Sequence, residues 1–415
     1  MRCRHCATAL NEGGDVFADL GTAPPSNAFL RSDDLARGQT HLPLKVYTCP
    51  TCWLVQVDEI ERHDQLFSSD YVYHSSTSAS WLAHARAFVE QAVPDLSLGP
   101  QSLVMELASN DGYLLQYLAP LGVPCVGIEP TDSTARVARE RGIETISQFF
   151  DLGFAQRFAR DRRQADLIVA NNVLAHVPDI NDFVAGMAAV LAPAGAISIE
   201  FPQLLQLVQQ NQFDTIYHEH FSYLSLGTVQ RILAAQGLVV WDVQSLTTHG
   251  GSLRVWAQHA ANVRAAQGRP VSPRVEVMLA VERAAGMQQA AFYQGFQPRC
   301  EAIKDELLAF LIEHKRSGQR VVGYGAAAKG NTLLNYAGVR ADLLPYVVDA
   351  SPYKQGRWLP GSRIPVVGVD RLWRDRPEVI LILPWNLSDE IGEQLQGARE
   401  WGATFATAIP RLRLW

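Results

Sequence analysis

The chain has 415 residues, of which 47% are hydrophobic and 19% are charged, as in ordinary globular proteins. Its length predicts two or three domains with ample material for a buried core. The 36 basic and 42 acidic residues give a net charge of −6, which argues against a nucleic-acid-binding surface and favours a small-molecule substrate.

Two C-x-x-C pairs lie within the first 52 residues. Each pair presents two sulfur atoms on one side of a turn, so together they supply four thiolates to one tetrahedral zinc ion. Four thiolates leave no open position for water or substrate, and we therefore expect a structural zinc in a module over residues 1–66. A disulfide or redox pair is the alternative, which a reducing cytoplasm disfavours. The candidate ligands are Cys3, Cys6, Cys49 and Cys52.

Two tyrosines, Tyr71 and Tyr73, follow this module ahead of a helix expected over residues 80–92. In an extended segment the two rings share one face, where their hydroxyl groups can reach a cleft. Packing of half-buried rings is the alternative explanation.

Residues 102–130 have the pattern of a strand, a tight turn, a helix and a second strand. The apolar residues 103–105 are typical of a parallel strand covered on both faces, and the small residues after them let the backbone approach a ligand. We expect the helix over residues 113–118. Glu129 ends the second strand, where a carboxylate can accept hydrogen bonds from both hydroxyls of a ribose. Gly112 is the one glycine in this turn, which favours a nucleoside over a pyrophosphate.

A buried strand expected over residues 165–170 ends at two asparagines and a loop that reaches Asp179. With E-L-A-S-N-D-G, this strand and loop resemble the cofactor site of S-adenosylmethionine (SAM) methyltransferases. An ordinary strand-to-helix turn without a ligand is the alternative. The resemblance implies SAM contacts from Glu106, Ala108, Asn110, Asp111, Gly112, Glu129, Asn171 and Asn172.

Residues 183–199 carry no charge and nearly reach the length of a membrane span. Pro193 and Gly195 interrupt the stretch, so a helix, a turn and a buried strand explain it better. No signal peptide fits ahead of Cys3. We expect a cytoplasmic protein that does not contact membranes.

The segment Y-H-E-H-F-S-Y over residues 217–223 holds the densest cluster of titratable and aromatic groups in the chain. Histidine titrates near neutrality and suits proton abstraction when a neighbouring Glu or Tyr orients it. Three roles are open for His218 and His220: metal ligands, which would need a third partner, buried core histidines, or a general base.

Long helices are expected over residues 275–317, before a strand that ends in the small-residue loop G-Y-G-A-A-A-K-G-N-T over residues 323–332. Such a loop presents backbone N–H groups and Lys329 to a diphosphate, although its spacing is not that of a P-loop. Strands expected over residues 346–349 and 379–383 complete a second Rossmann-like domain. A purely structural domain is the alternative.

Nearly the whole chain resembles the SAM-dependent sugar C-methyltransferases, which make branched deoxysugars on nucleotide carriers. The resemblance rests on these motifs in this order: the two C-x-x-C pairs, P-P-S-N-A-F, Y-x-Y-x-S-S, E-L-A-S-N-D-G-Y-L-L, Y-H-E-H-F-S-Y-L-S, H-G-G-S-L-R and G-Y-G-A-A-A-K-G-N-T. Ala108 departs from the family, which usually has glycine there.

This resemblance implies an α/β protein with an N-terminal zinc-binding module, a central Rossmann-like class I methyltransferase domain and a second Rossmann-like domain at the C-terminus. We expect the boundaries at residues 1–66, 67–257, with a helical lead-in over 67–100, and 258–415.

The family's reaction implies methyl transfer to C3 of a nucleotide-linked 4-keto-6-deoxysugar, after a base removes the acidic proton there. The family's base falls on His220, with Tyr217 and Glu219 near the sugar. Tyr71 matches a tyrosine that faces the reacting centre, where its hydroxyl stabilises the enolate oxygen. The expected substrate contacts are Tyr73, Tyr324, Lys329, Asn331, Lys354 and Arg357.

Two other functions are open at this point. Methylation of an oxygen or nitrogen atom on a similar sugar would use the same base, and a non-catalytic scaffold would use both nucleotide pockets as sensors. The sequence does not decide between a monomer and a dimer.

Overall fold

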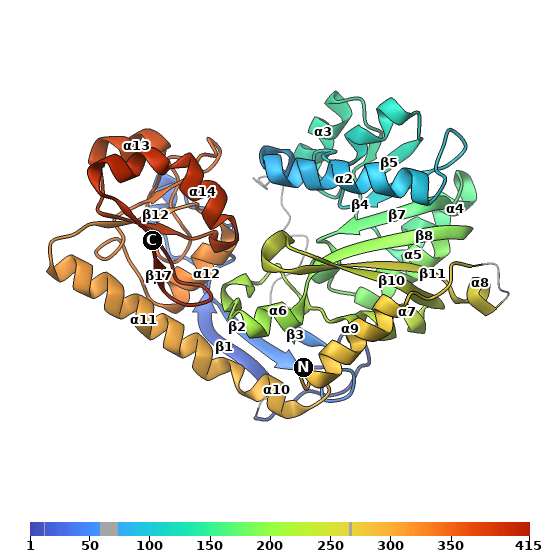
Figure 1. Ribbon diagram of the computed structural model, residues 1–415, viewed down its shortest axis with the longest axis horizontal. Coiled ribbons are helices and arrows are strands. Elements are labelled where there is room, and N and C mark those ends of the chain that lie inside the picture. The colour runs from blue at the N-terminus through green and yellow to red at the C-terminus, as the bar shows by residue number, and fades with distance from the viewer. Residues whose placement is uncertain (12, 59–73, 265–267) are drawn as a thin grey trace.

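The structure, a computed structural model, describes residues 1–11, 13–58, 74–264 and 268–415. Within these ranges the strands form sheets of four, seven and six strands. Figure 1 shows the seven-stranded sheet on the right, the six-stranded sheet on the left, and the small sheet below and between them.

The small sheet is antiparallel, with strand order β1-β2-β3-β9. Its last strand comes from the Y-H-E-H-F-S-Y segment, because Val55 lies opposite Tyr223 and Gln56 opposite Ser222. The small sheet is therefore completed by residues far from the zinc motif. Its strands are β1 (Val16–Ala23), β2 (Leu42–Thr48), β3 (Val55–Val57) and β9 (Ser222–Tyr223).

The seven-stranded sheet has the order β10-β11-β8-β7-β4-β5-β6, in which β4 to β8 are parallel and β11 is antiparallel to its neighbours. Chain order reverses between β4 and β7, and ligands of such sheets bind in the crevice at the carboxyl ends of the strands there. The strands are β4 (Val104–Leu107), β5 (Cys125–Ile128), β6 (Thr145–Ile146), β7 (Ala165–Asn171), β8 (Leu191–Pro202), β10 (Leu238–Leu246) and β11 (Ser252–His259).

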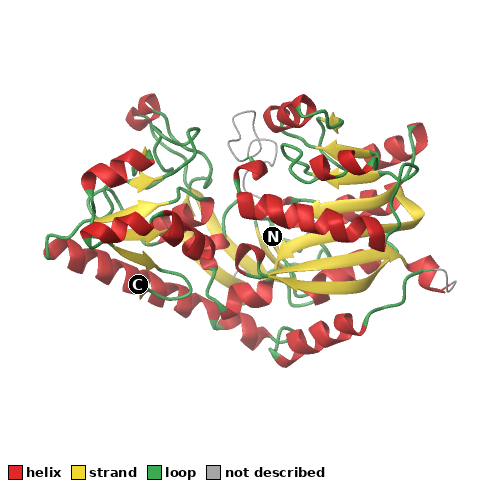
Figure 2. Ribbon diagram, turned by 45° about the horizontal axis from the view of Figure 1, so that its top comes forward, coloured by secondary structure: helices red, strands yellow, loops and turns green. Residues whose placement is uncertain are grey.

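Helices cover both faces of this sheet, as Figure 2 shows. Alternate residues of β4 point to opposite faces, so Val104 packs in one core with Phe88 of α2 while Met105 packs in another with Phe183 of α5. The helices of this part are α2 (Ala79–Asp95), α3 (Asp132–Glu140), α4 (Leu152–Asp161), α5 (Ile180–Val190), α6 (Leu204–Gln209), α7 (Leu226–Ala235), α8 (Ala260–Arg264) and α9 (Pro273–Ala284).

The helix expected over residues 80–92 is confirmed as α2, whereas the helix expected over residues 113–118 is wrong. The chain there forms short 3-10 turns at Leu115–Tyr117 and Ala119–Leu121. Gly112 has a left-handed φ of 77°, and Pro120 lacks the N–H group that an α-helix needs. The segment between Gly112 and Pro120 is therefore too short for a regular α-helix and forms 3-10 turns instead.

The six-stranded sheet has the order β14-β13-β12-β15-β16-β17 and is parallel except for β17. Its chain order reverses between β12 and β15, so the loop after β12 lies where sheets of this kind usually bind ligands. The strands are β12 (Val321–Tyr324), β13 (Val347–Val348), β14 (Val366–Val367), β15 (Val379–Ile382), β16 (Thr404–Thr407) and β17 (Arg413–Leu414). The helices are α10 (Ala290–Gln294), α11 (Phe296–Arg316), α12 (Ala328–Tyr336), α13 (Val369–Asp375) and α14 (Ser388–Gln394).

The small sheet shares its core with both larger parts. Phe17 of β1 stacks on Phe296 of α11 with ring centroids 4.5 Å apart, and α11 runs along the lower edge of the molecule below β1 (Figure 1). On the other side, Cys3, Cys49 and Cys52 belong to the same apolar cluster as residues of the seven-stranded sheet. In the part of the chain that the structure describes, no helix has both the length and the apolar composition to cross a membrane.

Candidate active site and zinc centre

The four cysteines of the C-x-x-C pairs meet at one point, with their Sγ atoms all within 4.8 Å of one another. The Sγ atoms of Cys3 and Cys52 are 3.5 Å apart, as are those of Cys6 and Cys49. Sulfur ligands of a tetrahedral zinc are separated by about 3.8 Å when each Zn–S bond is about 2.3 Å. The donor set and its spacing therefore fit a closed structural zinc, as predicted.

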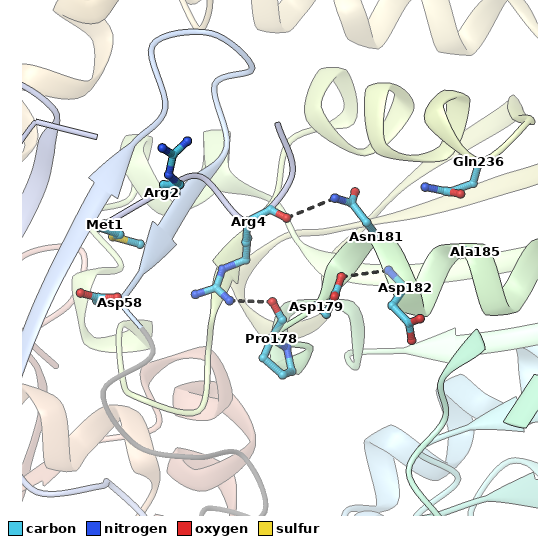
Figure 3. Close-up of a pocket in the computed structure, with 10 residues that line it drawn as sticks. All are labelled: Met1, Arg2, Arg4, Asp58, Pro178, Asp179, Asn181, Asp182, Ala185 and Gln236. Atoms are coloured by element: carbon cyan, nitrogen blue, oxygen red, sulfur yellow. Dashed lines mark hydrogen bonds between the residues drawn. The ribbon is translucent and has the colours of Figure 1, made fainter. Parts of the chain in front are cut away.

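The first cysteine knuckle is tied to the seven-stranded part by Arg4. Its guanidinium donates to the carbonyl oxygens of Pro178 (2.7 Å) and Val57 (2.6 Å). An open pocket of about 780 Å³ lies at this junction (Figure 3). None of the predicted site residues lines it, because its walls come from the knuckle, the first turns of α5, Asp58 and Gln236.

The predicted cofactor loop follows β4 and turns sharply, with Ala108, Asn110 and Gly112 all at left-handed φ (54°, 51° and 77°). Glu129 holds this loop, since its Oε2 accepts from the N–H of Asn110 (2.9 Å) and its Oε1 from the N–H of Thr131 (2.9 Å). Each carboxylate oxygen keeps a second lone pair for a ligand hydroxyl. Glu129 thus both shapes the loop and lies where a ribose is expected.

Several buried oxygen atoms at the ends of β4 and β7 have no hydrogen-bond partner among the described residues: both carboxylate oxygens of Glu106 and the Oδ1 atoms of Asn171 and Asn172. Burial raises the pKa of Glu106 well above its ordinary value. Buried polar atoms without partners are rare, and a cluster of them marks a place where a ligand donates hydrogen bonds. SAM carries an ammonium group and two ribose hydroxyls, so these residues fit it.

Two of the predicted cofactor residues, Asp111 and Asn110, accept hydrogen bonds from the segment before α2. The Oδ2 of Asp111 accepts hydrogen bonds from the backbone and hydroxyl of Ser76, and Arg141 lies 3.6 Å away. The Oδ1 of Asn110 accepts from the N–H of Ser75 (2.9 Å). Both side chains therefore hold the segment before α2 over the cofactor loop.

His220 is positioned by its backbone neighbours. Its Nδ1 donates to the carbonyl oxygen of Thr215 (2.8 Å), since a carbonyl can only accept. Burial, with the charges of nearby cationic groups, holds its pKa well below the ordinary value, so the ring is neutral and Nε2 keeps its lone pair. The ring packs on Tyr217 with centroids 4.0 Å apart and against the edge of His176 at 4.5 Å.

Glu219 and His218 of the same segment are held by the loop after β1 and by the small sheet. The amide of Asn27 donates to both carboxylate oxygens of Glu219 (2.9 and 2.7 Å), and burial raises the pKa of Glu219 to about 7. His218 lies against the carbonyl of Pro43, 3.1 Å from its Nε2. Among the residues that the structure describes, the cysteines form the one group suited to a metal, which disfavours the metal-ligand role for these histidines.

The loop after β12 brings part of the predicted substrate set close to this cluster. The Nζ of Lys329 donates to Oδ1 of Asn386 (2.6 Å) and lies 4.7 Å from the centroid of the Trp385 ring. The Nε1 of Trp385 donates in turn to Oδ2 of Asp214 (2.8 Å), whose pKa burial raises to about 7. Lys329 is thereby held beside the segment that carries His220.

The other predicted substrate residues lie further into the six-stranded part. Lys354 donates to the carbonyl of Ala326 (3.0 Å) and lies 3.5 Å from Asp349, while Arg357 is in the same turn. Asn331 is buried, and neither its Oδ1 nor its Nδ2 has a partner among the described residues. Tyr324 is buried at the end of β12. Tyr71 and Tyr73 lie outside the described residues.

A buried charge network lies next to the predicted cofactor asparagines, since the N–H of Asn172 donates to the carbonyl of Glu200 (2.7 Å). Glu200 accepts from Arg254 (2.8 Å), from Thr248 (2.9 Å) and from His84, whose Nε2 is 2.8 Å away. Burial alone would raise the pKa of Glu200. The hydrogen bond from His84 and the charge of Arg254 outweigh burial, so this pKa lies below its usual value. Trp81 packs on His84 and on Tyr113, which directly follows the cofactor loop, so it connects this network to the loop.

Other site residues were missed as well, because their roles depend on partners distant in the sequence. His176 and Asn27 stand in motifs that were noticed, V-L-A-H-V-P and P-P-S-N-A-F, so a search of these motifs for polar side chains would have found them. His249 opens the noticed motif H-G-G-S-L-R, Asp349 ends the strand expected over residues 346–349, and Trp385 follows the strand expected over residues 379–383. Asp214 gave no such signal.

Models of known protein families match each of the three parts of the chain. Models of a zinc-binding domain, a methyltransferase domain and the C-terminal domain of C-methyltransferases match residues 3–67, 81–243 and 247–410. C-methyltransferase NovU of Streptomyces niveus is 35% identical over 99% of this chain and 96% of its own length.

Solved structures match less than half of the chain. Magnesium protoporphyrin IX methyltransferase of Synechocystis PCC 6803, with bound S-adenosylhomocysteine, is 18% identical over 42% of this chain and 82% of its own, with a TM-score of 0.34. The PH0226 protein of Pyrococcus horikoshii OT3 is 14% identical over 45% of this chain and 95% of its own, with a TM-score of 0.36. From the full-length match and the three domain models, the chain belongs to the C-methyltransferase family and is a SAM-dependent methyltransferase that transfers a methyl group to carbon.

Proposed function

We propose that this enzyme methylates C3 of a nucleotide-linked 4-keto-6-deoxysugar, with His220 as the general base. The observation that carries this proposal is the hydrogen bond from His220 Nδ1 to the Thr215 carbonyl, 2.8 Å long. It assigns the proton of the neutral ring to Nδ1 and leaves Nε2 as an acceptor.

The residues around His220 support a reaction that begins with removal of a proton from carbon. Nε2 removes a proton from the carbon beside the ketone, and the electron pair of the broken C–H bond is delocalised onto the carbonyl oxygen. Tyr217, packed on the ring, and the buried Glu219 restrict the orientation of the base and the sugar. SAM, when bound, supplies the electrophilic methyl group that a carbon nucleophile requires.

The nucleotide end of the substrate is assigned to the six-stranded part. A crevice at the carboxyl ends of β12 and β15 is the usual ligand position in such a sheet. The unpartnered amide of Asn331 lies in the first turn of α12, beside backbone N–H groups that favour an anion. The two crevices would then hold SAM and the nucleotide sugar on opposite sides of His220.

The test uses the purified enzyme, SAM with a labelled methyl group, and a panel of nucleotide 4-keto-6-deoxysugars. We expect a new carbon-bound methyl signal at C3 in the NMR spectrum of one product. In deuterium oxide without SAM, the same sugar should exchange its C3 proton, whereas the matching 4-hydroxy sugar should not. Methylation of oxygen or nitrogen without any exchange would reject the enolate.

A further inference from the structure

Lys329 is connected to His220 by a continuous series of contacts. Its Nζ packs over Trp385 at 4.7 Å from the ring centroid, and Trp385 donates to Asp214 (2.8 Å). Asp214 precedes Thr215, whose carbonyl accepts from His220 (2.8 Å). A lysine of the six-stranded part is thus connected, through Trp385 and Asp214, to the base of the seven-stranded part.

The turn that carries His249 packs against the other side of this contact. A Cβ atom added at Gly250 would lie 2.3 Å from Trp385 Cη2, so the ring lies directly on this backbone. His249 has a left-handed φ of 53°, and its Nε2 is buried without a partner among the described residues. The site therefore places a cation between the two parts of the protein, near the buried Nε2 of His249.

The electrostatics agree with this placement. The positive charge of Lys329 contributes, after burial, to lowering the pKa of both His220 and His249. Burial lowers the pKa of Lys329 itself, and the charge of Asp214 opposes that shift. The ammonium group has three N–H donors, and Asn386 takes one of them, so donors remain for a substrate.

We propose that the Lys329 ammonium stabilises the negative charge that develops on the ketone oxygen when His220 removes the neighbouring proton. The inference rests on the proposed function and revises the role expected for this lysine, which was to hold the diphosphate. In this step the C–H bond breaks, the proton moves to Nε2, a C=C bond forms and the carbonyl π electrons move to oxygen. When the proton returns from Nε2 to carbon, the C=O bond forms again and Lys329 has kept all its protons.

The matched variants are Lys329→Met, Lys329→Arg and Lys315→Met. Lys315 pairs with Asp342 at the surface, with about half of its side chain exposed (52%), so it controls for loss of a lysine. The readouts are the rate of C3 deuterium exchange without SAM and the Kd of the nucleoside diphosphate alone. Circular dichroism and the melting temperature establish that each variant is folded.

We expect Lys329→Met to slow exchange by roughly 10²–10³-fold, the scale of losing one preorganised donor to an oxyanion. The Kd of the nucleoside diphosphate should stay within about twofold of the wild-type value, because Lys329 is not expected to contact the phosphates. A lost phosphate contact would raise this Kd roughly tenfold, which corresponds to about 1.4 kcal/mol of binding free energy. Lys329→Arg should exchange faster than Lys329→Met because it keeps the charge, and Lys315→Met should match the wild type.

Wild-type exchange in Lys329→Met, together with a tenfold weaker Kd, would overturn this inference and restore the diphosphate role. Equally slow exchange in the methionine and arginine variants would also overturn it, because charge would then have no effect. Absence of exchange in the wild-type enzyme would reject the proposed function, and this inference with it.

Discussion

His220 differs from His218 although the two lie in the same motif. The Nε2 of His218 lies against a carbonyl of the small sheet, whereas His220 uses Nδ1 for a backbone carbonyl and keeps Nε2 for other partners. Residue spacing does not reveal this difference, since it depends on which backbone each ring meets.

Replacing the base should separate catalysis from folding. We expect His220→Asn to lower turnover by roughly 10²–10⁴-fold, the usual contribution of a general base, without changing SAM affinity. His218→Asn, the same substitution two positions earlier, should lower the melting temperature and leave the exchange rate near that of the wild type. Steady-state kinetics and calorimetric SAM binding check both variants, and normal turnover in His220→Asn would exclude it as the base.

The pH dependence should report the environment of His220. Burial lowers its pKa well below the ordinary 6.5, and the charges of His176, His249 and Lys329 lower it further. The base stays neutral at mildly acidic pH, so we expect the acidic limb of kcat/KM below pH 6.5. In Lys329→Met a positive neighbour is gone, which favours the protonated ring and shifts this limb to higher pH. A limb above pH 6.5 in the wild type would contradict the assignment.

The loop after β4 shows how an element can be predicted in outline and missed in detail. Its strands, its small residues and Glu129 were predicted, because apolar runs and turn-forming residues are visible in the sequence. The helix after it was wrong, since left-handed φ angles at Ala108, Asn110 and Gly112 are a property of the folded backbone that the apolar pattern of residues 113–118 does not carry.

Removing the charge of Glu129 should weaken SAM binding through this loop. In Glu129→Gln one oxygen becomes an NH₂ group that faces a backbone N–H, so the loop loses a charge-assisted hydrogen bond of about 1.5–3 kcal/mol. We expect a Kd for SAM that is roughly 10–150-fold higher. Glu144→Gln, an exposed residue paired with Arg162, serves as the matched control. An unchanged Kd in Glu129→Gln would mean that SAM binds elsewhere.

At the scale of the whole molecule, the site is assembled from segments far apart in the chain. Glu219 and its partner Asn27 are 192 positions apart, and Trp385 and Asp214 are 171 apart. The fold class followed from local patterns and from the order of the motifs. The pairing of side chains across three sheets did not, because it depends on how the sheets pack.

Zinc removal should destabilise more than the zinc module. The cysteines share an apolar core with the seven-stranded sheet, so losing the metal should disturb that core too. We expect a chelator to lower the melting temperature by about 2–4 °C for each kcal/mol of unfolding free energy that is lost. Added zinc should restore the melting temperature. Metal analysis must show that zinc has left, and an unchanged melting temperature in the metal-free protein would contradict a structural role.

The strand pairing between β3 and β9 has a consequence for synthesis on the ribosome. Residues 55–57 emerge early, but their partners at residues 222–223 are made much later, and the stacking partner of Phe17 is Phe296. Chains fold from the N-terminus as they are made. The first module to leave the ribosome is therefore completed only after most of the chain exists. Until then the module has three of its four strands, and zinc bound by the cysteines adds a link between its two knuckles, so metal supply during translation should raise the yield of folded enzyme.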